Sequence, residues 1–297
     1  MRTINPGDVS PMQLQAVLQG AIAPRPIAFA STIDSQGLVN LSPFSFFNLF
    51  SSNPPVVIFS PARRVRDNTT KHSLQNVLEV PECTINIVSY DMVQQTSLAS
   101  TEYEKGVNEF VKAGFKMLPS DLVKPPRVAE SPVQLECKVL EVMALGENGG
   151  AGNLVICEVL RIHVAERIFD ENGRIDPYKI DQVARLGGDW YSRAREGLFE
   201  VEKPLTTRGI GIDALPEAVR NSVILSGNDL GRLGNLEKLP DAAEMNAALA
   251  QPEIGEARVR FALDAESLEF HFHEIAKNWI AENRVGEALA LLWQAGR

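Results

Sequence analysis

The chain has 297 residues, of which 44% are hydrophobic and 23% are charged, the composition of an ordinary globular protein. Its formal net charge of −9 argues against binding of nucleic acid or an anionic membrane through bulk charge. A chain of this length buries about 75% of its unfolded surface and needs no disulfide or metal to fold. The sequence shows neither a secretory leader nor an apolar run long enough to span a bilayer, so we expect a cytoplasmic protein.

The negative charge is unevenly distributed along the chain. Residues 1–195 carry 19 Lys+Arg and 21 Asp+Glu, whereas residues 196–297 carry 10 and 17. The last third therefore holds most of the excess acid. We predict two domains, 1–195 and 196–297, of which the second is an acidic extension.

Short strands dominate the pattern of the first domain. Ser10-Pro11 predicts the start of an amphipathic helix that ends near Gly20, and Leu74, Val77 and Leu78 mark a second short helix. Apolar or alternating runs predict strands at 26–33, 38–41, 54–60, 83–89, 133–143 and 154–164. Because these strands do not alternate regularly with helices, an antiparallel barrel is favoured over a parallel sheet. The fold class is thus mainly β (α+β), with short peripheral helices.

The pattern becomes helical from about Ser192. Helices are predicted at 215–220, 241–250 and 276–293, the last with apolar residues at helical spacing. The acidic third is therefore also the helical third. We expect this extension to pack on the barrel or on a partner subunit and to narrow access to a ligand.

Three cysteines, Cys83, Cys137 and Cys157, lie far apart in apolar stretches and form no Cys-x-x-Cys pair. We interpret them as small buried side chains rather than as a disulfide framework or a zinc site. His271 and His273 are placed on one face of a possible strand without a third ligand, and His163 lies in an apolar strand as a structural residue. No metal site is predicted.

The densest positive charge follows the strand that ends at Ser60. Arg63, Arg64, Arg66 and Lys71 fall within nine residues, just before a predicted helix. Guanidinium groups, backbone N–H groups and a helix N-terminus together can bind a phosphate. A solvated basic loop is an equally supported alternative from composition alone.

A second group of candidate residues is the block Asn40–Asn48, where three phenylalanines alternate with serine and asparagine. Flat apolar walls with polar groups at the edge suit a planar aromatic ligand. Taken alone, the block is better explained as a core strand with a polar kink. The glycines at 209–211 and 225–234 lack the context of a dinucleotide fold and are read as turns and caps.

The order of several motifs resembles the flavin reductase-like family. The matching segments are 25–37, 40–48, 54–60, 71–76, 153–164 and the Arg-Leu-Gly-Gly segment within 184–191. The resemblance implies an antiparallel Greek-key split β-barrel that binds FMN, as a homodimer with the flavin near the subunit interface. Where the family commonly has Lys-Asp-Thr, this chain has Lys71-His72-Ser73.

The resemblance also implies which residues line the flavin site. The basic loop would hold the phosphate and the aromatic block would face the isoalloxazine ring. The implied residues are Ser31, Thr32, Asn40, Ser42, Pro43, Phe44, Ser45, Phe46, Phe47, Asn48, Ser60, Arg64, Lys71, His72, Ser73 and Arg185. No catalytic side chain is required, because the flavin carries the hydride chemistry.

The function implied is an NAD(P)H-dependent FMN reductase, with NADH or NADPH as electron donor. Two alternatives share the same FMN site: a flavoredoxin-like electron carrier and a non-catalytic flavin-binding protein. A monooxygenase or an electron-transfer protein is the expected macromolecular partner.

Overall fold

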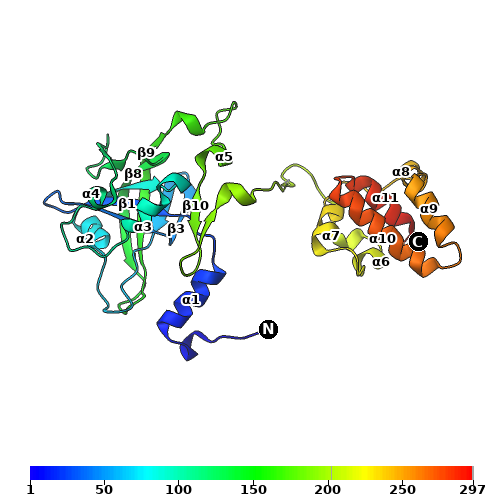
Figure 1. Cartoon of the computed structure of the whole chain (residues 1–297), viewed down its shortest axis with the longest axis horizontal. Helices are drawn as coiled ribbons and strands as arrows, with labels where there is room; N and C mark the ends of the chain where they lie inside the picture. The colour runs from blue at the N-terminus through cyan, green and yellow to red at the C-terminus, as the bar shows by residue number, and fades with distance from the viewer. Residues whose placement is uncertain (202, 296–297) are drawn as a thin grey trace. The chain divides into compact units, whose positions relative to one another are not determined.

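The computed structural model describes residues 1–201 and 203–295, which form two compact units, Met1–Phe199 and Glu200–Arg297 (Figure 1). We call them the barrel unit and the helical unit and describe each by itself. The sequence-based division was placed after residue 195.

Seven antiparallel strands form the main sheet of the barrel unit, in the order β2-β1-β5-β8-β9-β4-β3. Their bounds are Ala28–Ile33 (β1), Val39–Phe44 (β2), Phe47–Ser52 (β3), Pro55–Phe59 (β4), Glu82–Ile87 (β5), Val133–Ala144 (β8) and Asn153–Val164 (β9). The hairpins β1–β2 and β8–β9 are those predicted from the sequence. Strand β3 was not predicted, because it does not alternate and its pairing with β4 is interrupted by an irregularity between Leu49 and Ser51.

The two edge strands of this sheet are neighbours in sequence. Only Ser45 and Phe46 separate the end of β2 from the start of β3. Since two residues span only about 7 Å, the edges must approach each other and the sheet must roll up. The result is a barrel with a split between β2 and β3, which confirms the predicted fold class.

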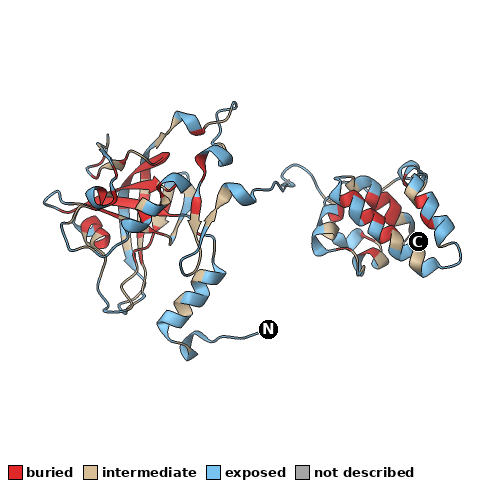
Figure 2. Ribbon diagram, viewed as in Figure 1, coloured by how far each residue is buried: buried red, intermediate tan, exposed pale blue. Residues whose placement is uncertain are grey.

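The barrel interior is apolar. Phe59, Ile85 and Val155 belong to one buried cluster that fills it (Figure 2). A second cluster lies on the other face of β1, where Phe29 and Leu41 pack with Phe110. The alternation along β1, with Ala28 and Ala30 facing inward, follows from the two-residue period of a strand.

Short elements surround the barrel. Helix α1 (Pro11–Ala21) is capped by Ser10, whose side chain forms a capping box with Gln13. The remaining peripheral elements are α2 (His72–Glu79), α3 (Val93–Leu98), α4 (Glu109–Ala113), α5 (Pro177–Ile180), the pair β6 (Met117–Leu118) and β7 (Arg127–Val128), and the pair β10 (Val183–Arg185) and β11 (Tyr191–Arg193).

The three cysteines lie on the adjacent strands β5, β8 and β9, and all are buried and free. The sulfur atoms of Cys83 and Cys157 are 3.8 Å apart. Their environment confirms the expectation of small buried side chains.

The helical unit has an apolar core of its own. Buried residues such as Trp279, Ile280, Leu289 and Leu291 pack together there (Figure 2). Its helices are α6 (Glu217–Arg220), α7 (Gly227–Gly234), α8 (Ala242–Leu249), α9 (Pro252–Arg260), α10 (Ala265–Ala281) and α11 (Val285–Ala295). Within the described part of the chain, no helix is long and apolar enough to cross a membrane.

Three expectations for this unit were wrong. The single helix expected at 276–293 is divided between α10 and α11, because Asn283 adopts the left-handed conformation with φ 66°. His271 and His273 lie in α10 and not in a strand, so they do not share a face. Residues 225–234 were read as turns and helix caps; Ser226 does cap a helix, but residues 227–234 form that helix, α7, and not a turn.

Candidate functional site

Three cations of the barrel unit converge on one carboxylate. Arg64 Nε lies 2.8 Å from Glu102 Oε1, Arg66 Nη2 lies 2.9 Å from Oε2, and Lys71 Nζ lies 3.5 Å from Oε1. Arg64 and Arg66 follow β4, Lys71 is the N-cap residue of α2, and Glu102 belongs to the connection between α3 and α4. The chain therefore builds a compact site for an anionic oxygen group.

Local hydrogen bonds hold the basic loop in place. Arg64 Nη1 donates to Thr69 Oγ1 and to the Thr70 carbonyl, both at 2.8 Å. The β8–β9 loop also contacts the basic loop, since the Arg63 N–H donates to Ala151 O at 2.8 Å. A Cβ on Gly149 would lie 2.9 Å from the Arg64 carbonyl oxygen, so this close approach requires glycine.

Arg64 and Lys71 border a small hollow of about 20 Å³ at the start of α2. Its polar wall includes a hydrogen bond of 2.8 Å from Asn40 Nδ2 to Ser73 Oγ. Six of the predicted site residues line it: Asn40, Ser42, Arg64, Lys71, His72 and Ser73. Sequence reasoning missed the other side of the hollow, which is formed by residues 99–103 and Glu109.

Electrostatics in the hollow are those of an anion site. Hydrogen bonds from Arg64 and Arg66 lower the pKa of Glu102 to about 2. Burial, and then the charge of Arg64, lower the pKa of Lys71. Burial raises the pKa of Glu109, whose carboxylate accepts the Leu41 N–H at 2.9 Å. Burial is the main cause of the lowered Lys71 pKa and repulsion by Arg64 adds to it, and a bound anion would offset both.

Other predicted residues lie inside the fold. Ser31 and Thr32 are fully buried on β1, with side chains on opposite faces. Thr32 Oγ1 accepts a hydrogen bond from Asn76 at 3.1 Å, whereas the Ser31 hydroxyl has no partner among the described residues. Ser60 Oγ accepts the Asn153 N–H at 3.1 Å.

Residues 43–48 of the aromatic block do not line the hollow. Pro43 and Phe44 end β2, and the Phe44 ring packs in the barrel core at 5.4 Å from the ring of Phe59. Phe46 is 39% exposed. The rest of the block comprises Ser45, between the strands, and Phe47 and Asn48, which begin β3.

Arg185 belongs to a separate group of residues. Its guanidinium lies 4.6 Å from the ring centre of Tyr191, and its backbone exchanges two hydrogen bonds of 2.9 Å with Arg25. The Arg25 guanidinium in turn lies 5.9 Å from the centre of the Phe46 ring. The predicted residues are thus divided between the cation hollow, the buried sheet and this arginine–aromatic group.

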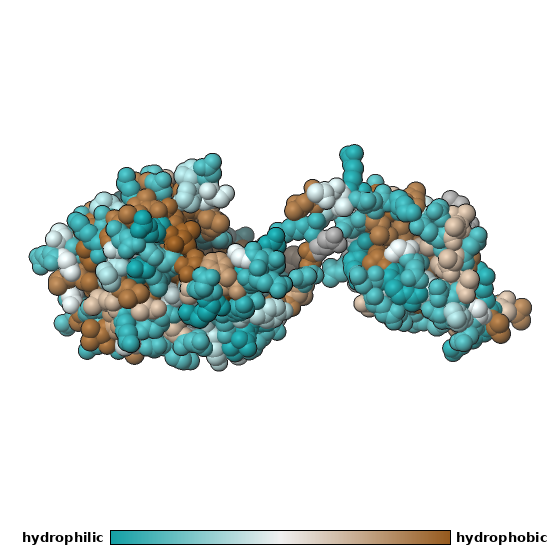
Figure 3. Space-filling view, turned by 90° about the horizontal axis from the view of Figure 1, so that it is seen from above, coloured by the Kyte–Doolittle hydropathy of each residue, from teal (hydrophilic) through white to brown (hydrophobic). Residues whose placement is uncertain are grey.

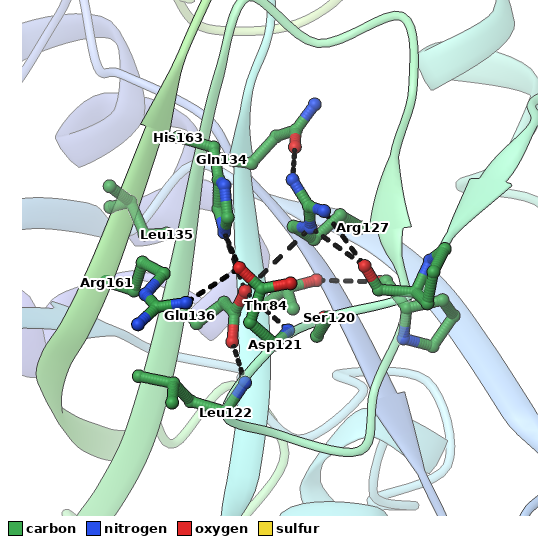
Figure 4. Close-up of polar contacts among 12 residues, drawn as sticks. Thr84, Ser120, Asp121, Leu122, Arg127, Gln134, Leu135, Glu136, Arg161 and His163 are labelled. Carbon is green, nitrogen blue, oxygen red and sulfur yellow. Dashed lines mark hydrogen bonds and ion pairs between the residues drawn. The ribbon is translucent and has the colours of Figure 1, made fainter.

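A further polar cluster lies where the β8–β9 hairpin meets the loop before β7 (Figure 4). Asp121, Glu136 and His163 each bring one ligand-type atom within 4.8 Å of the others. Arg161 Nη1, however, lies 2.8 Å from Asp121, and Arg127 Nε lies 3.8 Å from Glu136. These arginines already supply the positive charge, so the cluster is a structural ion-pair network.

Known proteins match the barrel unit. The family model "Flavin reductase like domain" matches residues 21–179. An uncharacterized protein of Aquifex aeolicus is 36% identical over 181 residues, which cover 61% of this chain and 90% of that protein. The protein BH2278 of Halalkalibacterium halodurans is 34% identical over 203 residues, covering 68% of this chain and 96% of that one.

Among solved structures, nitrilotriacetate monooxygenase component B from Bacillus cereus superposes with a TM-score of 0.62 and 28% identity. The alignment covers 68% of this chain and 98% of that one, so part of this chain has no counterpart there. The fold and the family match place the barrel unit in the split-barrel class of flavoproteins. The chain belongs to the flavin reductase-like family.

Proposed function

We propose that this protein is an NAD(P)H-dependent flavin reductase in which hydride passes from NADH or NADPH to bound FMN. The observation that carries the proposal is the convergence of Arg64, Arg66 and Lys71 on the single carboxylate of Glu102. Such a donor set fits the phosphate monoester of FMN, which needs several N–H donors and more than one positive charge. The flavin, when bound, supplies the hydride-accepting ring.

The role proposed for the protein's own residues is to bind and orient the flavin. Arg64 and Lys71 would hold the phosphate, and the hydroxyl of Ser73, fixed by Asn40, lies beside them. The exposed Phe46 ring and the Arg185 guanidinium, which lies 4.6 Å from the Tyr191 ring centre, are surfaces of the kind that planar rings bind. We assign no side chain to proton transfer.

We also propose that the barrel unit forms a homodimer. Strand β3 is an edge strand of the sheet, and on it Leu49 is 62% exposed and Phe50 is 64% exposed. Figure 3 shows apolar side chains gathered on the visible face of the barrel unit. Exposed apolar groups of this size are typical of association surfaces. Sedimentation equilibrium tests the dimer: the wild type should sediment as a dimer, and Phe50→Asp should shift it toward monomer.

Anaerobic mixing tests the reductase proposal directly. FMN-loaded protein is mixed with NADH or NADPH in a stopped-flow instrument while flavin absorbance is recorded. Rapid bleaching with either nucleotide is the expected result. If the protein binds FMN but neither nucleotide bleaches it, the electron-carrier alternative is supported. A protein that binds no FMN would refute both.

A further inference from the structure

Glu102 occupies the position in which the cations would receive a phosphate. Its two oxygens accept from Arg64 and Arg66, and Lys71 lies 3.5 Å away. The remaining hollow of about 20 Å³ has room for roughly one water molecule. The carboxylate therefore occupies the N–H donors that a phosphate in this hollow would use.

The segment that carries Glu102 is loosely attached. Residues 99–108 connect α3 to α4, and Ser100, Thr101, Glu102 and Glu104 are exposed. The backbone hydrogen bonds that the structure gives residues 100–107 are all local, such as Thr101 N–H to Leu98 O at 3.1 Å. The ion pairs of Glu102 are thus the main polar contacts between this segment and the basic loop. Segments with few buried contacts open at low free-energy cost.

We infer that Glu102 is an internal counter-ion that competes with the flavin phosphate for Arg64, Arg66 and Lys71, and that residues 100–107 move away when the phosphate binds. This inference rests on the proposed FMN site. The phosphate of FMN carries close to two negative charges at neutral pH, so it displaces a single carboxylate from three cations. The exchange weakens FMN binding relative to an open site.

This competition affects the binding of FMN but not that of riboflavin, because only FMN carries a phosphate. Riboflavin has the same ring system but no phosphate, so it has no reason to displace Glu102. The carboxylate therefore sets how readily FMN exchanges, and the cations remain paired while the site holds no flavin. A flavin that dissociates readily serves as a shared substrate rather than as a permanently bound group.

Flavin titrations of three proteins test this inference. The wild type, Glu102→Gln and Glu104→Gln are titrated with FMN and with riboflavin, and Kd is measured by quenching of flavin fluorescence. Glu104 is a matched control: it lies in the same segment and makes no ion pair among the described residues. Glu102→Gln should lower the Kd for FMN about tenfold and change that for riboflavin less than about twofold. Glu104→Gln should leave both values unchanged.

An unchanged or raised Kd for FMN in Glu102→Gln would overturn the inference, because Glu102 would then be neutral or would position the arginines for the ligand. If neither the wild type nor Glu102→Gln binds FMN, the proposed flavin site itself is wrong. Hydrogen exchange of the wild type gives a second readout that needs no variant. Amides of residues 100–107 should exchange faster with saturating FMN than with riboflavin, and equal or slower exchange would contradict the opening.

Discussion

His163 on β9 and Glu136 on β8 are joined by a hydrogen bond of 2.6 Å between Nε2 and Oε1. The same carboxylate accepts the backbone N–H groups of Asp121 at 2.9 Å and Leu122 at 2.6 Å. Glu136 is completely buried. Burial alone would raise its pKa, but these hydrogen bonds outweigh burial and lower it. One carboxylate therefore fastens the loop before β7 to the barrel (Figure 4).

Removal of this carboxylate should destabilise the barrel unit strongly. Glu136→Ala removes the acceptor of the Asp121 and Leu122 N–H groups and of His163, and it takes away the buried charge that lies 3.8 Å from Arg127 Nε, so we expect a loss of about 3–5 kcal/mol in the free energy of unfolding. Asp121→Ala removes an exposed ion pair with Arg161 and should cost less than about 1 kcal/mol. Urea denaturation of both variants measures the difference. Equal, small losses would show that the network does not hold the loop.

The phosphate assignment predicts a graded series of arginine variants. Arg64→Ala should raise the Kd for FMN by roughly tenfold or more, because a charge-assisted hydrogen bond is lost at the hollow. Arg66 is 73% exposed and does not line the hollow, so Arg66→Ala should change Kd less than about threefold. Titration calorimetry with FMN gives both values. A larger effect for Arg66 than for Arg64 would place the phosphate elsewhere.

The helical unit should lose stability on acidification through His273. Its Nδ1 lies 2.7 Å from Ser222 Oγ, its Nε2 is buried without a partner among the described residues, and burial lowers its pKa below 6.5. The unfolded chain therefore binds this proton more readily than the folded one. The contribution of His273 is complete above about pH 6.5, falls as the pH drops below that value, and levels off below the folded pKa.

Thermal unfolding followed by circular dichroism at 222 nm between pH 5 and 7.5 checks this dependence. Substitution His273→Gln removes the titrating group and should flatten the slope of the melting temperature against pH. His271 is a suitable control, since it pairs at the surface with Glu274 at 2.8 Å. A slope that survives in His273→Gln and vanishes in His271→Gln would contradict the assignment.

The two units should fold independently. Each has its own buried apolar cluster, and that of the helical unit includes Leu215, Trp279 and Leu292. Residues 200–297 expressed alone should therefore show helical circular dichroism and a cooperative melt. A weakly helical chain without a cooperative transition would disprove this. That the extension narrows access to the flavin stays a prediction, tested by comparing NADH oxidation by residues 1–199 and by the full chain.

Local sequence patterns predicted those parts of the structure that depend on interactions between residues close in sequence. The N-cap at Ser10 and the alternating strands 133–143 and 154–164 were predicted because cap chemistry and burial repeat at fixed spacing. The break at Asn283 was not, because the sequence Glu-Asn-Arg has neither glycine nor proline to mark the left-handed residue.

The same distinction between local and long-range interactions applies to the candidate site. Arg64 and Lys71 were found because they are close in sequence and precede a helix. Glu102 lies 31 residues beyond Lys71 in a segment without a motif, and only the tertiary fold brings the two together. The family resemblance placed Phe44 at the flavin, whereas the local pattern alone favoured a core strand, and the Phe44 ring lies in the core.

The three buried thiols allow the opening of the barrel to be measured by their rate of chemical modification. Cys83, Cys137 and Cys157 are the cysteines of the whole sequence, and all belong to adjacent strands at the centre of the sheet. An alkylating reagent can reach them only when those strands separate, so its reaction rate measures the opening of the barrel. The helical unit has no cysteine, so its fluctuations do not contribute to the alkylation rate. The opening rate of the barrel unit can therefore be measured in the full-length, unlabelled wild-type protein.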